Sequence, residues 1–419
     1  MNISGPLAAA FAVTLTVSGT VTAQAGESHT DMVGDGAPTS RTSEYVVVLD
    51  DTARVTSSLT KAEHAYGASV DNVYRSAIKG YSARMTPSEA AALAQAPGVD
   101  AVEPNVRFEI AGQSLPTGIN RTNADRSPRA GIDRRDQRVN VDVAVIDTGV
   151  DVDHPDLNVY RRGGKNCSAF ARGKNDQHGH GTHVAGTIGA LDNGRGVVGM
   201  APGARIWPVR VFDRSGAGSL AEVICGVDYV TAHAKQIEVA NMSLSSLGGS
   251  DDGACGRVSG DPLHKAVCAS VARGVTYVVA AGNTARDAAL STPSAYDEVI
   301  TVSALADFNG RPGGGARSTC RADRDDTFAD FSNYGADVDL VAPGVCVRST
   351  WVGGRYSTIS GTSMASPHVA GGAALFMSRH PAAKPAAVRS ALIRAGSMRW
   401  KYADDRDGRH ERLLDVSGF

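Results

Sequence analysis

Residues 141–149 read VDVAVIDTG, an apolar run that ends in an aspartate and a tight Thr-Gly turn. Further candidates for buried strands follow at 206–212, 239–244, 275–281 and 299–305. Helical patterns separate these runs, at about 182–191, 220–234, 263–273 and 364–379. Continuous apolar strands that alternate with helices are typical of a parallel sheet with helices on both faces. The sequence therefore predicts a three-layer α/β domain with a central parallel sheet.

Polar residues follow two of the predicted strands. Asp147 ends the strand at 141–146, and Asn283 follows the strand at 275–281. In an open parallel sheet, ligands bind beyond the carboxyl ends of the strands. Both residues therefore lie where this fold places a binding or catalytic site.

Three short segments together hold the side chains of an acyl-transfer site: VIDTG at 145–149, HGTH at 180–183 and GTSMAS at 361–366. A serine hydroxyl is a poor nucleophile unless a base lies within hydrogen-bond reach, and that base needs a carboxylate to orient it. Ser363 can attack a carbonyl, His180 can accept its proton, and Asp147 can orient and stabilise the imidazolium. We interpret these residues as a candidate catalytic triad.

Two other kinds of chemistry would use parts of these segments. Asp-Thr-Gly also occurs in aspartic proteases, but these need two carboxylates that share a proton, and the sequence has no second such motif. His178, His180 and His183 invite a zinc site, yet no acidic or cysteine ligand is suitably spaced and the HExxH motif is absent. We interpret His183 as a structural histidine and His178 as a surface one.

Ser363 is predicted to begin a helix whose first turn tolerates Pro367. The positive end of the helix dipole favours negative charge, so the Ser363 amide can face a developing oxyanion. The order Asp, His, Ser and the long segment GTSMASPHVAG at 361–371 resemble the subtilisin-like serine proteases, closest in character to secreted bacterial subtilisin and proteinase K-type members. The resemblance extends over nearly the whole chain.

This resemblance implies the three-layer subtilisin-like fold and a secreted serine endopeptidase with polypeptide substrates and an acyl-enzyme on Ser363. It also implies that the Asn283 amide is the second oxyanion donor. Substrate would pair as an extended strand between two exposed edges. The matching residues are Gly216, Ala217 and Gly218 on one side and Ser243, Leu244 and Ser245 on the other.

The pocket for the residue before the scissile bond is expected to be uncharged. Its walls would be formed by Leu244, Ala280 and Ala281, with Ser291 at the base. The family commonly has Gly-Gly after Ser-Leu, whereas this chain has Ser245 and Ser246, and a side chain at 245 would narrow the pocket or tilt its rim. We predict a preference for apolar or aromatic residues in this pocket.

The resemblance implies structural calcium at two places and no organic cofactor. The first place combines one carboxylate with a loop that offers amide and carbonyl oxygens, which are the hard ligands of Ca²⁺; its residues are Asp156, Leu191, Asn193, Arg195 and Val197. The second resembles a site of proteinase K-like members and consists of Asp339 with the carbonyls of Asp297 and Val299. Turn formation is the competing explanation for these Asp and Asn residues, above all at the second place.

The N-terminal part of the chain is expected to be removed. Residues 1–25 resemble a signal peptide, with an apolar stretch at 6–17 and small residues at 23–25, although no Lys or Arg precedes Arg41. Residues 26–43 are polar and are interpreted as a linker.

Residues 44–111 predict a small α+β domain. The expected order is β-α-β-β-α-β, with Thr86 as a helix N-cap, and this is the order of a ferredoxin-like domain. Its strands are predicted at 45–49, 70–77, 80–85 and 99–110, and its helices at 61–66 and 87–95. It resembles the inhibitory propeptide of subtilisin-like proteases; an accessory binding domain is the alternative. Residues 112–419 would be the catalytic domain, released by self-cleavage near 111–114.

Composition and charge narrow the range of partners. With 42% hydrophobic and 21% charged residues among 419, the chain is typical of a globular protein. A net charge of −2 gives no indication of a nucleic-acid or anionic-membrane partner, and no apolar run reaches the roughly 18 residues of a membrane-spanning helix. We expect a monomer.

Six cysteines in a chain that is expected to be exported favour disulfides. Cys255 and Cys268 bracket a Gly/Asp-rich loop and are favoured as a pair; Cys167–Cys225 and Cys320–Cys346 then follow, although six cysteines allow 15 complete pairings. Metal binding is the competing explanation, but no CxxC spacing occurs.

Two rival functions were weighed against an active protease. An esterase is disfavoured because the Gly-x-Ser-x-Gly elbow is absent, since residue 365 is Ala. A catalytically inactive binding homologue would not need the full set of Asp147, His180, Asn283 and Ser363. An insertion at 307–326, rich in Gly, Arg and Asp, has no assigned role.

Overall fold

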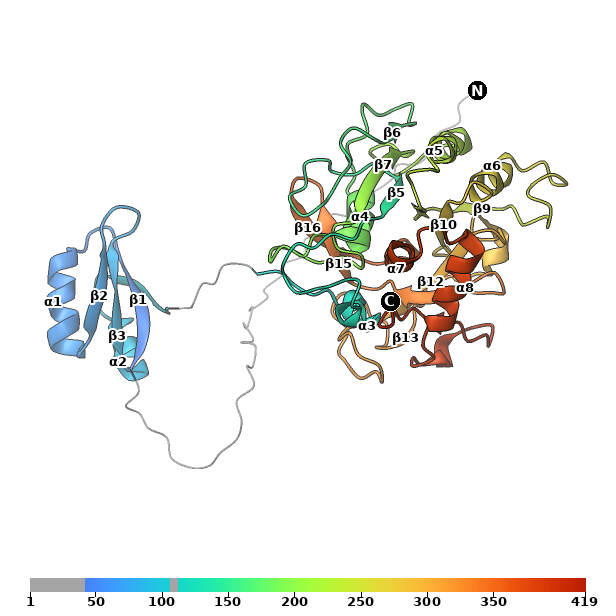
Figure 1. Cartoon of the computed structure of the whole chain (residues 1–419). Coiled ribbons are helices and arrows are strands. Elements are labelled where there is room, and N and C mark those ends of the chain that lie inside the picture. Colours follow the sequence, from blue (N-terminus) through green and yellow to red (C-terminus); the bar gives the residue numbers. More distant parts are fainter. Residues whose placement is uncertain (1–41, 106–111) are drawn as a thin grey trace, which may run out of the picture. The chain divides into compact units, whose positions relative to one another are not determined.

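The computed structural model describes residues 42–105 and 112–419, which divide into two compact units (Figure 1). The predicted signal peptide, nearly all of the predicted linker and the end of the strand predicted at 99–110 lie outside the described residues. None of the helices in the described ranges is both long and apolar enough to cross a membrane.

The first unit has the predicted β-α-β-β-α-β order. Its elements are β1 Ser43–Leu49, α1 Val55–Tyr66, β2 Ser69–Tyr74, β3 Gly80–Met85, α2 Pro87–Leu93 and β4 Val99–Pro104. The strands form an antiparallel sheet in the order β2-β3-β1-β4. Thr86 caps α2 as predicted, in a reciprocal capping box with Glu89. Helix α1 begins six residues before the predicted start, because its first turns are polar and exposed and carry little apolar periodicity.

The second unit is built on a sheet whose strand order is β17-β14-β12-β10-β8-β5-β7-β6, with every neighbouring pair parallel. These strands are β5 Asp142–Asp147, β6 Lys165–Asn166, β7 Arg205–Arg210, β8 Val239–Met242, β10 Thr276–Ala280, β12 Ile300–Ala306, β14 Leu340–Pro343 and β17 Arg412–Leu413. The short β13 (Thr327–Phe328) joins β12 antiparallel. The five predicted strands are all present, with shifts of one or two residues at most ends.

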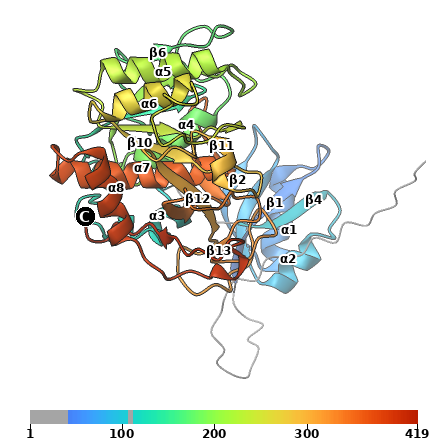
Figure 2. The same cartoon turned by 90° about the vertical axis from the view of Figure 1, so that its right-hand side faces the viewer.

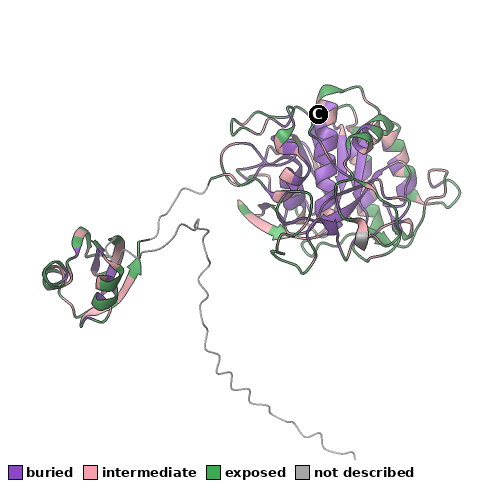
Figure 3. Ribbon diagram, turned by 90° about the horizontal axis from the view of Figure 1, so that it is seen from below, coloured by how far each residue is buried: buried purple, intermediate pink, exposed green. Residues whose placement is uncertain are grey.

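Helices cover both faces of this sheet, as predicted (Figure 2). On β5, Val143 and Val145 point into a core shared with α4, α7 and α8, whereas Ala144 and Ile146 point into a core shared with α5 and α6. Alternation is expected because successive side chains of a strand point to opposite faces. The helices are α4 His180–Gly189, α5 Leu220–Ala232, α6 Pro262–Val271, α7 Thr362–Arg379 and α8 Pro385–Ala395. Figure 3 shows the buried residues concentrated in this layered centre.

Smaller elements complete the second unit. They are α3 Thr117–Arg121, the hairpin β15 Val347–Trp351 with β16 Arg355–Ile359, the pair β9 Ser246–Leu247 with β11 Ser291–Thr292, and the 3-10 turns Ala124–Arg126, Ala288–Leu290 and Tyr402–Asp404. All six cysteines form disulfides in the favoured pairing, Cys167–Cys225, Cys255–Cys268 and Cys320–Cys346.

The insertion at 307–326 packs against the N-terminal helix of this unit. The buried guanidinium of Arg121 in α3 donates to Asp326 Oδ1 and lies 3.3 Å from Asp307 Oδ2. Burial raises the pKa of Asp307 to about 7. The insertion therefore has a structural anchor in α3, which the sequence patterns did not reveal.

Candidate active site

The three predicted triad residues lie at one edge of the central sheet. Asp147 is the last residue of β5, His180 the first residue of α4, and Ser363 the second residue of α7. His180 hydrogen bonds to Asp147, and Ser363 bonds to Ser243, which follows β8. Because β5 and β8 are parallel neighbours, both helices begin at the same carboxyl edge.

Helices α4 and α7 pack against each other. A β-carbon at Gly371 in α7 would lie 3.1 Å from the carbonyl oxygen of Ile188 in α4. Ile188 comes eight residues after His180, and Gly371 eight residues after Ser363. Since both helices start at the same edge, this contact places His180 and Ser363 at equal distances along the axes of α4 and α7, so that the two residues lie side by side.

The Asp147–His180 pair has the geometry of a buried charge-assisted hydrogen bond. Asp147 Oδ1 lies 2.7 Å from His180 Nδ1 and also accepts a hydrogen bond of 2.7 Å from the Thr148 amide. The carboxylate is fully buried, while 22% of the imidazole is exposed. A carboxylate bound to Nδ1 leaves Nε2 as the basic nitrogen.

The pKa of His180 is raised above its usual value. Burial opposes the charged imidazolium most strongly, but the charge and hydrogen bond of Asp147 together with the charge of Asp176 outweigh it. The environment therefore stabilises the imidazolium that forms when His180 accepts a proton.

Asp176 is a site residue that the sequence interpretation missed. It is buried and accepts five hydrogen bonds, from the hydroxyls of Thr148 and Thr182 and from three amides; the amides belong to His178, Gly179 and Thr182. Thr148 Oγ1 in turn accepts from the Gly181 amide. This network joins the turn after β5 to the start of α4. An aspartate four residues before His180 was the available signal.

The Ser363 hydroxyl donates to the main-chain carbonyl of Ser243 at 3.3 Å. No hydrogen bond joins it to His180 within the described residues. Such bonds are often long or misaligned without substrate and tighten in the reacting complex.

A buried polar chain holds the nucleophile from behind. Ser366 Oγ donates to Asn241 Oδ1 at 2.7 Å, Asn241 Nδ2 donates to Ser243 Oγ at 2.9 Å, and Ser243 Oγ donates to the Ser363 carbonyl at 2.8 Å. Asn241 lies in the middle of β8 and is fully buried. It was not identified from the sequence, where it stands within an apolar run.

Two N–H donors face one small space beside Ser363. Asn283 Oδ1 accepts from the amide and hydroxyl of Thr362, at 2.8 and 2.9 Å, which turns the Asn283 Nδ2 group outward. A β-carbon at Gly361 would lie 3.6 Å from Asn283 Nδ2 and 3.7 Å from the Ser363 amide nitrogen. The absence of a side chain at 361 keeps this space open between the two donors.

The predicted substrate edges are exposed or close to the surface and have free backbone groups. Gly218, Leu244 and Ser245 form no backbone–backbone hydrogen bond within the described part of the chain. A pocket of about 320 Å³ lies between the two edges and is lined by Gly218, Leu244 and Ser245. Most of its remaining surface is apolar. Its other lining residues are Phe212, Ser219, Leu220, Val223, Ser246, Gly248, Gly249, Asp261, Leu263, Thr292 and Tyr296.

Other predicted pocket residues lie outside this lining. Ala280, Ala281 and Ser291 are buried and do not line the pocket. The one carboxylate of the lining, Asp261, already accepts from the Tyr296 hydroxyl and from two amides at the start of α6. The lining thus differs from the uncharged pocket expected from the sequence, since it includes one carboxylate, which three hydrogen bonds hold in place.

The neighbouring histidines do not gather into a metal site. His183 is fully buried, and its Nε2 bonds to the Val347 carbonyl at 2.9 Å; burial lowers its pKa to about 3, so the ring is neutral. His178 is half-buried and lies beside Gly216. His183 is thus structural, as predicted.

The first predicted calcium place brings its residues together. Asp156 accepts from Asn193 Nδ2 and from the Val197 amide, both at 3.0 Å. The carbonyls of Leu191 and Val197 converge on the side-chain amide of Gln113, at 2.6 and 3.1 Å. Burial raises the pKa of Asp156 to about 6. A buried carboxylate with converging carbonyls fits a hard cation, and Gln113, whose amide oxygen and nitrogen are interchangeable by a flip, joins the set. Arg195 lies in the same loop, where its amide donates to Asn193 Oδ1 at 2.9 Å.

The second predicted calcium place needs correction. Arg389 of α8 donates to Asp339 Oδ1 at 2.7 Å and to the Asp297 carbonyl at 2.8 Å. A guanidinium thus contacts two of the three predicted ligands and supplies a positive charge where the calcium ion was expected. The sequence could not indicate this, because Arg389 comes fifty residues after Asp339.

Taken together, the fold and the disposition of these side chains are those of a serine-type hydrolase. A family model described as "Subtilase family" matches residues 139–413, and one described as "Peptidase inhibitor I9" matches residues 28–111. The chain belongs to the subtilase family and carries an I9 domain ahead of its peptidase domain. It is a serine endopeptidase, as the sequence analysis predicted.

Individual relatives agree with this assignment. A thermostable alkaline protease of Halalkalibacterium halodurans is 37% identical over 350 residues, 84% of this chain and 85% of the relative. Subtilisin E of Bacillus subtilis is 34% identical over 354 residues, 83% of this chain and 84% of the relative. Among solved structures, the crystal structure of a cold adapted subtilisin-like serine proteinase is similar to this chain with a TM-score of 0.52 and 33% sequence identity. The match covers 68% of this chain and 97% of the proteinase chain.

Proposed function

We propose that Asp147, His180 and Ser363 are the catalytic triad of a self-processing, secreted endopeptidase. The observation that carries this proposal is the buried 2.7 Å hydrogen bond between Asp147 and His180 at the edge where α7 begins with Ser363. Ser363 attacks the peptide carbonyl while His180 Nε2 takes its proton. His180 then protonates the leaving amine, and water hydrolyses the acyl-enzyme by the reverse steps.

The charge that develops on the carbonyl oxygen is stabilised by the Ser363 amide and Asn283 Nδ2. Both donors border the space above Gly361, and the amide lies at the positive end of α7. Thr362 contributes indirectly, since its hydrogen bonds to Asn283 Oδ1 fix the orientation of the amide group.

Substrate binds as an added strand between Gly216–Gly218 and Ser243–Ser245, whose backbone groups supply the hydrogen bonds. The largely apolar pocket between these edges, whose one carboxylate (Asp261) is already hydrogen bonded to Tyr296 and to two amides, supports a preference for apolar or aromatic residues. Digestion of a peptide library should show faster cleavage after Phe or Leu than after Arg or Lys; the opposite order would contradict this preference.

The zymogen organisation supports self-processing. Residues 1–25 direct export, 26–43 are a linker, 44–111 act as an intramolecular inhibitor, and 112–419 are the mature enzyme, which we expect to be a monomer. The match of an inhibitor family to residues 28–111 and the three disulfides support this scheme. Calcium, held by Asp156, Gln113, Asn193 and the carbonyls of Leu191, Arg195 and Val197, would stabilise the mature domain.

Expression of the full chain beside Ser363→Ala tests this function. The unmutated chain should shorten to begin near residue 112 and react covalently with a serine-directed phosphonylating probe, and Ser363→Ala should do neither. Ser390→Ala, an exposed serine of α8, is the matched control and should behave as the unmutated chain. Labelling of Ser363→Ala, or its self-shortening, would contradict the assignment.

A further inference from the structure

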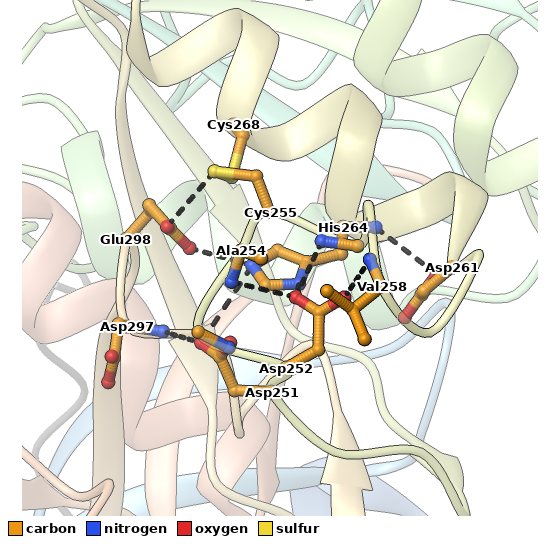
Figure 4. The surroundings of a disulfide bond; sticks show 12 residues. Asp251, Asp252, Ala254, Cys255, Val258, Asp261, His264, Cys268, Asp297 and Glu298 are labelled. Atoms are coloured by element: carbon orange, nitrogen blue, oxygen red, sulfur yellow. Dashed lines mark hydrogen bonds and ion pairs between the residues drawn. A yellow bond between two sulfur atoms is a disulfide. The ribbon is translucent and has the colours of Figure 1, made fainter.

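The disulfide Cys255–Cys268, which ties the loop before α6 to that helix, belongs to a group of side chains of metal-ligating types (Figure 4). Cys255, Cys268, His264 and Glu298 each offer one ligand atom, and these four atoms lie within 4.8 Å of one another. The triad uses none of them. The sequence did not indicate this group, because Glu298 comes from the strand-start region before β12 and the two cysteines lack a CxxC spacing.

Glu298 contacts two of the other three side chains in this group. Glu298 Oε1 lies 3.3 Å from Cys255 Sγ, and Glu298 Oε2 lies 2.8 Å from His264 Nε2. Zinc bonds of about 2.3 Å to sulfur and about 2.0–2.2 Å to nitrogen or oxygen place neighbouring ligand atoms about 3.3–3.8 Å apart. To reach this spacing, the disulfide must open so that its sulfurs separate, and Glu298 must move slightly away from His264.

His264 has a second nitrogen that is buried without a partner. The residue is fully buried, and its Nδ1 has no hydrogen-bond partner among the described residues. The nearest carboxylate oxygen is Asp252 Oδ1, at 3.7 Å. Asp252 is held in place by main-chain amides of its own loop; these belong to Ala254, Gly256, Val258 and Ser259.

A small movement of His264 toward Asp252 would give the arrangement of a metal-bound histidine, because the 3.7 Å between Nδ1 and Asp252 Oδ1 is longer than a hydrogen bond. When Nε2 binds a metal, Nδ1 carries the proton and points to a carboxylate that fixes the ring. Asp252 lies on the required side, and the His264 ring is also stacked on Tyr296 with 4.1 Å between the ring centroids. Cys255, Cys268 and Glu298 are only partly buried, so an ion can reach them from solvent.

We propose that reduction of the disulfide converts this position into a Zn²⁺ site formed by Cys255, Cys268, His264 and Glu298. A dithiol reductant gives two electrons and two protons to the disulfide; two thiols form and the reductant becomes a disulfide. Zn²⁺ then binds the two sulfurs as thiolates and releases both thiol protons to solvent. Two thiolates, an imidazole and a carboxylate are the ligands zinc prefers, whereas calcium requires oxygen. Disulfide and zinc thus exclude each other, and either one holds the loop 251–261 against α6.

Cobalt spectroscopy on the full chain tests the proposal. The Ser363→Ala chain, used to prevent self-cleavage, is reduced with dithiothreitol, freed of reductant under nitrogen and titrated with Co²⁺. The reduced chain should bind one equivalent with thiolate-to-cobalt charge-transfer and tetrahedral d–d bands, and Zn²⁺ should displace it. The oxidised chain should show neither band.

Matched variants assign the ligands. Cys255→Ser with Cys268→Ser should abolish the bands, whereas Cys320→Ser with Cys346→Ser should keep them. His264→Gln or Glu298→Gln should weaken Co²⁺ binding at least tenfold, and Asp252→Asn about 10–100-fold; circular dichroism checks that each variant is folded. The proposal is overturned if the reduced chain shows no bands, if the bands survive loss of Cys255 and Cys268, or if folded His264→Gln and Glu298→Gln chains bind unchanged.

Discussion

The charge of Asp147 decides the pH at which His180 can act as a base. Asp147 and Asp176 raise the pKa of His180, and only the neutral imidazole can accept the proton of Ser363. The acidic limb of kcat/KM should therefore have its midpoint above pH 6.5, the usual value for histidine. Activity is lost below this midpoint and retained above it.

Asp147→Asn should lower kcat by about 10⁴-fold, the size of loss known for this change in serine proteases. It should also shift the acidic limb to lower pH, because the charge that raises the His180 pKa is removed. Steady-state kinetics across pH 5–9 measure both effects, since rates at saturating peptide substrate give kcat and rates at low substrate give kcat/KM. Asp153→Asn, an exposed carboxylate near the same turn, is the control. A limb that stays in place would show that Asp147 does not set the pKa of His180.

Asn283→Ala should lower kcat by about 10²–10³-fold with little change in KM, as loss of this kind of donor does in subtilisin. Its amide contacts the space beside Ser363 and not the substrate edges. Steady-state kinetics with a peptide substrate separate the two constants, and an unchanged melting temperature confirms the fold. Near-normal kcat would remove Asn283 from the mechanism.

Single residues also show where sequence reasoning ended. Asp147, His180 and Ser363 stand in dense local motifs that predict their roles, whereas the role of Asn283 was predicted from the family resemblance. Asp176, Asn241 and Thr362 act only through partners elsewhere in the chain: Asn241, for instance, bridges Ser366 and Ser243 from inside a strand. A polar residue in an apolar run carries no local sign of such a role.

The packing of α4 on α7 holds His180 and Ser363 level, and Gly371 is the close contact. A β-carbon at 371 would lie 2.3 Å from Met200 Cβ, in the loop after α4, and 3.1 Å from the Ile188 carbonyl, so this loop must move away from α7 and α4 must shift slightly to accept it. Gly371→Ala should cost about 1–3 kcal/mol of unfolding free energy, as overpacking does, and lower kcat.

Gly372→Ala is the matched control in the same helix. A β-carbon there meets only the ends of side chains, at 3.2 Å or more, and alanine favours helix. We expect the melting temperature to change little and kcat to stay the same. Equal effects at both positions, measured by thermal melting and steady-state kinetics, would contradict the role given to the α4–α7 contact.

Elements with strong periodicity were predicted best. The five central strands β5, β7, β8, β10 and β12 and helices α4, α5, α6 and α7 lie within a few residues of their predicted ranges, because burial on both faces leaves long apolar runs. The short strands β6, β14 and β17 of the same sheet were not predicted. The hairpin β15–β16 and the start of α1 were not predicted, since their residues are mixed and partly exposed.

For the whole mature domain, stability should depend on calcium and pH together. The pKa of Asp156 is raised from 3.8 to about 6 by burial, so the fold favours its protonated form. The contribution of Asp156 to the free energy of unfolding is therefore greatest below about pH 4, and it is lost as the pH rises through 6. Calcium binds the carboxylate and should reverse the loss, by about 2.7 kcal/mol at 100 times Kd.

Thermal melts of the Ser363→Ala chain test this linkage. The rise in melting temperature on adding Ca²⁺, relative to a chelator, should be larger at pH 7 than at pH 5. Asp156→Asn should abolish that difference, and Asp153→Asn should preserve it. A calcium-induced rise that is the same at both pH values would contradict the assignment of Asp156 as a ligand.

The sequence by itself determined the layered sheet, the order of the first unit and the residues of the candidate triad, because each depends on local periodicity or on a compact motif. Of the disulfides it favoured directly only Cys255–Cys268, which closes a short loop. Only the tertiary structure decided which distant groups share a space. It placed Gln113 among the carbonyls of the first calcium loop, Arg389 where a second cation was expected, and Glu298 beside His264 and Cys255. The physical reason is that strand order and helix packing set such contacts, and neither leaves a mark at fixed spacing along the chain.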